Sequence, residues 1–92
     1  VNAAVRRLAP APEFILFLGD EIAGYTADAD SLRRQWRHWL DTEMGWLDRR
    51  AIPMWHTTSN HATYDALSED VFREVHDHLP RNGPPGQEGL SY

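Results

Sequence analysis

The chain has 92 residues, a formal net charge of −5 and 41% hydrophobic residues, which suits one small domain with a modest core. Cysteine is absent, which excludes disulfides and thiolate metal sites; any metal would be held by carboxylate, amide or imidazole groups. The acidic balance argues against a nucleic-acid-binding module, and no apolar run approaches the length of a membrane span.

The first two predicted elements are a helix and a buried strand. Apolar residues recur at helical spacing over 1–8, and the proline-rich segment 9–12 ends that helix. Five consecutive apolar residues follow at 14–18, and Gly19 and Asp20 come directly after them. A continuous apolar run bounded by turn residues predicts a strand buried on both faces, as in parallel sheets.

Asp20 falls just past the carboxyl end of this predicted strand, at the edge where open α/β sheets bind ligands. Gly19 allows the backbone to turn sharply there. Asp20 has two interpretations. It is either a capping or loop aspartate, or a metal ligand or acid–base group, and the residue by itself does not decide between them.

The next segment predicts a long helix that begins near Asp28 and carries an apolar face through to Leu47. Its other side carries arginines, which indicate a solvated face, with a phosphate-binding face as the alternative. Residues 51–55 predict a second strand, with Pro53 at its beginning because proline cannot donate to a ladder. Strand, helix and strand form a right-handed βαβ unit, so we expect the loop 56–65 to lie beside Asp20.

A third helix is expected after Ser68, its predicted N-cap, and ends at Pro80. His76 and His78 lie two positions apart and point to different sides of a helix, so we expect solvated or helix-terminal histidines rather than a metal pair. His56, just before the loop, is a candidate for a supporting position at the site. Residues 90–92 can open a third strand.

The predicted βαβ unit presents Asp20 and the pair Asn60–His61 to one crevice. Oxygen and imidazole ligands of this kind suit Mn, Fe or Zn. An aspartate can bridge two cations held roughly 3.5–4 Å apart in hydrolytic sites, and a histidine can protonate a leaving alkoxide. The spacing equally allows a capping loop in which Asn60 and His61 stabilise a turn.

This pattern resembles the calcineurin-like metallophosphoesterase superfamily. Gly19-Asp20 is similar to its Gly-Asp block, and Ser59-Asn60-His61 is similar to its Gly-Asn-His-Asp/Glu block. The resemblance implies an αββα sandwich, a dinuclear metal site and hydrolysis of phosphomonoesters or phosphodiesters. It implies that Asp20 bridges both metals, that Asn60 binds one metal and touches the phosphate, and that His61 assists the leaving group.

The chain departs from the family pattern in several places. Ser59 stands where the family has glycine, and Ala62 stands where an acid normally follows the histidine, with Asp65 as a nearby substitute. There is no Asp-x-His block before residue 20 and no histidine after His78. We therefore interpret residues 1–92 as a single partial metallophosphoesterase domain, inactive by itself, whose phosphoester substrate belongs to a longer parent protein.

A second interpretation makes the chain a non-catalytic α/β fragment. Two or three short strands leave open sheet edges, which a second copy, the remainder of the parent chain or another partner could cover. A processed mature chain is the alternative to a fragment, because the sequence begins at Val1 without methionine. Neither interpretation involves a nucleic acid or a membrane.

Overall fold

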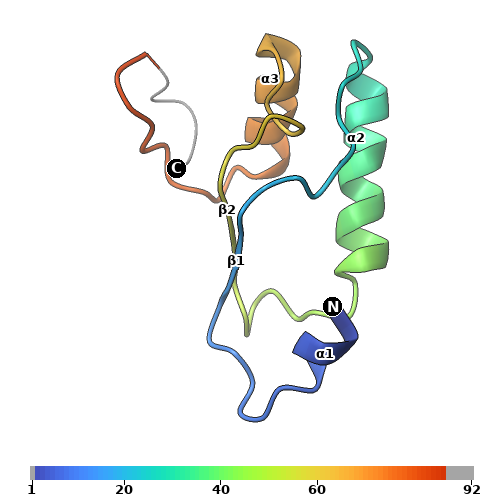
Figure 1. Ribbon diagram of the computed structural model, residues 1–92, viewed down its shortest axis with the longest axis vertical. Coiled ribbons are helices and arrows are strands. Elements are labelled where there is room, and N and C mark those ends of the chain that lie inside the picture. The colour runs from blue at the N-terminus through green and yellow to red at the C-terminus, as the bar shows by residue number, and fades with distance from the viewer. Residues whose placement is uncertain (1, 87–92) are drawn as a thin grey trace.

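The computed structural model describes residues 2–86, and Figure 1 shows its helices beside a small sheet. In chain order the elements are α1 (Asn2–Arg6), β1 (Ile15–Phe17), α2 (Ala29–His38), the π-helical turn η1 (Trp39–Glu43), β2 (Met54–His56) and α3 (Ala66–Val75). β1 and β2 pair in parallel, with Leu16 opposite Trp55. The mixed α/β class and the strand–helix–strand connection are therefore confirmed, and α2 supplies the crossover that parallel strands require.

The sheet is covered on one face, so the prediction of a first strand buried on both faces was wrong. Ile15 and Phe17 pack against the core, whereas Leu16 between them is 52% exposed. Trp55, opposite Leu16, is 39% exposed on the same face. Burial alternates because successive strand residues point to opposite faces and the helices lie on one side. The apolar run therefore leaves large apolar side chains in contact with solvent.

α2 begins where the sequence predicts it and ends earlier than expected. Asp28 is its N-cap, and the carboxylate accepts a hydrogen bond from the backbone N–H of Asp30 at 3.0 Å. Leu32 and Trp36 on the inner face are each 1% exposed. The backbone then widens into η1 and the helical segment stops, so Leu47 reaches the core from an irregular segment.

α3 begins at Ala66, and its N-cap is Asp65 rather than the predicted Ser68. Asp65 and Ser68 form a capping box, in which each backbone N–H donates to the side chain of the other at 2.8 Å. Val71 and Phe72 are buried between α3 and α2. The helix ends before Pro80, with His76 as its C-cap, and His76 is only 4% exposed. His76 is therefore a helix-terminal histidine, as one of the two expected alternatives had it, but it is buried in the core rather than solvated.

The core lies between α2, α3 and the covered face of the sheet. At its centre, Trp36 makes edge-on ring contacts with Trp39, Phe72 and His76. Within the described part of the chain, no helix has the length and apolar character needed to cross a membrane. The strand predicted at 90–92 lies outside the described residues.

Candidate functional site

The loops that follow β1 and β2 meet at one end of the sheet (Figure 1). The parallel pairing continues past the strands, because the backbone N–H of Thr57 donates to the carbonyl oxygen of Phe17 at 3.1 Å. The backbone N–H of Asp20 then donates to Oγ of Ser59 at 3.0 Å. The predicted meeting of the two loops is confirmed, since this hydrogen bond joins the Gly-Asp segment to the Ser-Asn-His segment.

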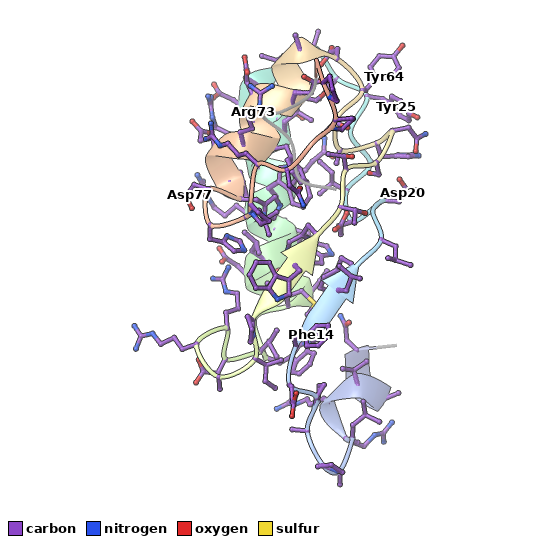
Figure 2. All side chains as sticks on the ribbon, turned by 90° about the vertical axis from the view of Figure 1, so that its left-hand side faces the viewer. Phe14, Asp20, Tyr25, Tyr64, Arg73 and Asp77 are labelled. Carbon is purple, nitrogen blue, oxygen red and sulfur yellow. The ribbon has the colours of Figure 1, made fainter. Side chains whose placement is uncertain are left out.

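The backbone of Gly19 and Asp20 adopts positive φ angles where Ser59 lies close to it. A Cβ atom on Gly19 would lie 2.4 Å from the Cβ of Ser59, and the φ angle of Gly19 is +109°. Asp20 also has a positive φ of 61°, a conformation in which aspartate is enriched among non-glycine residues. Its side chain is exposed, on the same side of the molecule as Tyr25 and Tyr64 and at the other end of β1 from Phe14 (Figure 2). Asp20 is thus positioned through its backbone while its carboxylate faces solvent.

Ser59 forms hydrogen bonds with three backbone positions. Its Oγ accepts from the N–H of Asp20 and from the N–H of Ala62 at 3.2 Å. Its carbonyl oxygen accepts from the backbone N–H and the Oγ–H of Thr63, each at 2.8 Å. The hydrogen bonds of Ser59 therefore stabilise the turn that contains Asn60 and His61.

Asn60 is oriented by Tyr25, which comes from the first loop. The Nδ2 amide of Asn60 donates to the hydroxyl oxygen of Tyr25 at 2.6 Å. Among residues 2–86, none donates to Oδ1 of Asn60, the atom that would bind a hard cation. Tyr25 has a positive φ of 51°, which is unusual for a bulky residue, and such strain gathers at functional sites.

His61 is oriented by the backbone of the first loop. Its Nδ1 lies 2.8 Å from the carbonyl oxygen of Ala23, which can only accept, so the hydrogen bond assigns the proton to Nδ1 and leaves Nε2 as the acceptor. The Tyr25 ring lies 4.5 Å from the imidazole, centroid to centroid. A Cβ on Gly24 would lie 1.9 Å from the carbonyl oxygen of His61. The segment 23–25 therefore fits closely around His61.

Asp65 does not replace the acid that the family places after the histidine. Its carboxylate accepts from the backbone and the hydroxyl of Ser68, and these hydrogen bonds lower the pKa of Asp65. Ala62, at the position of that acid, is 1% exposed in the core. The carbonyl oxygen of Ala23 instead orients the His61 ring through its hydrogen bond with Nδ1.

The sequence analysis missed Glu21, which anchors the first loop in the core. Its Oε1 lies 2.8 Å from Nδ1 of His56, and these side chains are 2% and 0% exposed. The pair connects the residue after Asp20 to the last residue of β2, and a supporting role of His56 at a functional site stays a prediction. No local signal reveals that Glu21 is buried, because its partner lies in a distant segment.

The two loops bring together few side chains that could bind a metal ion. Among the described residues, no group of three or more His, Cys, Asp and Glu side chains is placed to hold a metal ion. Asp20 and Asn60 offer a carboxylate and an amide oxygen, which suit hard cations but are fewer donors than a complete site uses. Comparison with models of known protein families, with curated proteins and with solved structures finds no match to this chain.

Proposed function

We propose that this chain forms part of a metal-dependent phosphoesterase site, in which Asp20 and Asn60 bind divalent Mn, Fe or Zn and His61 contacts the phosphate. The observation that supports the proposal is the hydrogen bond from the Asp20 backbone to Ser59, which sets the two motif blocks side by side. Both blocks follow the carboxyl ends of parallel strands, the edge at which α/β sheets bind ligands. The substrate is then a phosphomonoester or a phosphodiester.

Each residue has a role that its surroundings support. Bound cations would activate water and neutralise phosphate charge. Asp20 offers an exposed carboxylate on a backbone that Ser59 holds. Asn60 would bind a cation through Oδ1, because its Nδ2 amide donates a hydrogen bond to the hydroxyl oxygen of Tyr25. His61 would contact the phosphate through Nε2, because its Nδ1–H donates to the carbonyl oxygen of Ala23. Protonation of the leaving oxygen requires the imidazolium form, in which Nε2 also carries a proton.

We further propose that the missing metal ligands come from other parts of a parent protein with an αββα sandwich. Asp20 and Asn60 are too few to hold two cations, so the isolated chain would be inactive. The uncovered face of the sheet, where Leu16 and Trp55 are exposed, is consistent with further structure packing there.

The first experiment measures Mn²⁺ binding by paramagnetic broadening of backbone amide NMR signals. We expect selective broadening at 19–21 and 59–61, because the metal should lie between the two loops. Asp20→Asn should abolish the selectivity. Asp41→Asn, which removes an exposed carboxylate in η1, should leave it intact. Broadening spread evenly over the acidic surface would refute the metal assignment.

The second experiment measures hydrolysis of an aryl phosphate with Mn²⁺ by the full-length parent protein. Because Asp20 would bridge both cations, we expect Asp20→Asn to reduce hydrolysis by roughly 100-fold. Asp41→Asn again serves as the matched control. Equal activity of Asp20→Asn and the unaltered protein would refute the catalytic assignment.

A second candidate function, a non-catalytic fragment that assembles through its sheet, is favoured by the uncovered face. The exposed fractions there are large: Phe14 57%, Leu16 52%, Leu18 79% and Trp55 39%. Grouped apolar side chains on a surface mark interaction sites. Sedimentation should then show a dimer that Leu16→Thr weakens and Leu8→Thr, outside the sheet, does not. A monomer for the unaltered chain would exclude this candidate.

A further inference from the structure

A cavity of about 420 Å³ lies between the beginning of β2, the end of α3 and the segment before β2. Its volume falls within the range of roughly 300–1,000 Å³ that small-molecule sites occupy. The wall combines the apolar side chains of Leu40, Met54 and Val75 with the polar side chains of Arg49, His76 and His78. Residues 20, 60 and 61 do not line it, so the cavity is separate from the candidate phosphoesterase site.

His76 is the buried polar group of this wall. It is 4% exposed, and within residues 2–86 its Nε2 has no hydrogen-bond partner. Burial, together with the smaller effects of the nearby His56, His78 and Arg49, lowers the pKa of His76 to about 3. The ring is therefore neutral at pH 7 and has one N–H to donate. Buried polar atoms normally have partners, so a ligand at this wall would remove an unfavourable feature of the core.

Arg49 supplies the positive charge. It is exposed, and no carboxylate of the described residues lies within salt-bridge distance of it. A guanidinium without a protein partner is well suited to a planar oxyanion, which it can bind through two hydrogen bonds. His78 lies 6.1 Å from His76, ring to ring, and its Nε2 hydrogen-bonds to the carbonyl of Met54 at 3.2 Å. That bond directs the His78 ring toward β2.

Asp77 affects which kind of anion the cavity would bind. It also lines the cavity, is exposed and lies at the margin of the molecule in Figure 2. Its negative charge repels a doubly charged ion more than a singly charged one. The apolar part of the wall favours a ligand with an apolar body. These features together favour a carboxylate over a phosphate.

We propose that this cavity binds a small organic carboxylate, with Arg49 as the charge partner, His76 as the hydrogen-bond donor and the apolar wall around the rest of the ligand. The site does not rest on the proposed phosphoesterase function, because Asp20, Asn60 and His61 do not line the cavity, although His56 of the Glu21–His56 pair does. It would give the chain a ligand-binding function whether or not the two loops bind metal.

The test titrates the chain with benzoate and with benzamide, its neutral counterpart, and follows the imidazole NMR signals of His76 and His78. We expect saturable shifts with benzoate and affinity for benzamide weaker by about tenfold or more. Arg49→Gln should weaken benzoate binding by a similar factor, and Arg50→Gln, which does not line the cavity, should not. Equal binding of benzoate and benzamide, or equal effects of the two arginine variants, would overturn the proposal.

Two further measurements complete the test. Inorganic phosphate should bind more weakly than benzoate, and equal or tighter phosphate binding would overturn the carboxylate assignment. His76→Gln should weaken benzoate binding if circular dichroism shows that it remains folded. If His76→Gln unfolds, the comparison between Arg49→Gln and Arg50→Gln still decides the outcome, because both arginines lie on the surface.

Discussion

Glu21 and His56 form a hydrogen bond of 2.8 Å between side chains that are 2% and 0% exposed. The bond joins the loop after β1 to the last residue of β2, and Glu21 directly follows Asp20 in the chain. A buried pair of this kind adds little to the free energy of unfolding when it is compared with an apolar pair of similar size. Removal of one partner is costly, however, because the other stays buried without its compensation. The Glu21–His56 pair therefore couples the stability of the fold to the position of the site loop.

This coupling predicts the effect of Glu21→Ala. We expect the free energy of unfolding in urea to fall by about 3–5 kcal/mol, because His56 would lose its buried partner. Glu21→Gln should cost less, since the amide oxygen can still accept. Glu13→Ala, at an exposed position before β1, should stay within about 0.5 kcal/mol. A similar loss for Glu13→Ala and Glu21→Ala would contradict the role of the pair.

Gly19→Ala tests the contact between the two loops. We expect a loss of roughly 1–3 kcal/mol or more, because a positive φ and a clash with Ser59 act together. Gly86→Ala is the matched control, since Gly86 has a φ of +88° but nothing within 4 Å of an added Cβ. Ser59→Gly should partly rescue Gly19→Ala by removing the clashing atom. Unfolding curves that coincide for the two alanine variants would show that the contact is unimportant.

His76 predicts a dependence of stability on pH. Its folded pKa of about 3 lies below the ordinary 6.5, so the unfolded chain binds a proton that the folded chain does not. The stability that neutral His76 provides is complete above pH 6.5 and falls as the pH drops from 6.5 toward 3, by at most about 1.4 kcal/mol per pH unit. The free energy of unfolding in urea, plotted against pH across this window, should change less steeply for His76→Gln than for the unaltered chain. His38→Gln, at an exposed position, should keep the pH dependence of the unaltered chain.

Tyr25→Phe tests the orientation of Asn60. Loss of the hydroxyl leaves the Asn60 amide without its 2.6 Å partner, so we expect Mn²⁺ affinity to fall by about tenfold with little change in stability. Tyr64→Phe is the control, because the Tyr64 ring packs edge-on against Tyr25 but its hydroxyl has no partner among the described residues. Unchanged Mn²⁺ broadening in Tyr25→Phe would argue that Asn60 does not bind the cation.

The order of elements and the meeting of the two loops could be predicted from the residues themselves. Apolar runs, helical spacing and turn residues are local signals, and parallel strands joined by a helix bring their carboxyl ends to the same edge. That logic places Asp20 beside the loop 56–65, and the structure adds that Ser59 of this loop accepts from its backbone N–H. Whether Asp20, Asn60 and His61 act on phosphoesters stays a prediction.

The remaining features depend on contacts between segments far apart in the chain. The apolar run at 14–18 does not reveal which of its faces the helices cover. Neither Glu21 nor His76 carries a local sign of burial, because their partners lie on other elements. Asp65 and Ser68 are both good capping residues, and their reciprocal hydrogen bonds decide where α3 begins. Local sequence patterns thus determined the order and connection of the elements. The burial of individual side chains and their hydrogen-bond partners were decided by tertiary packing, because the residues around a side chain come from segments distant in the sequence.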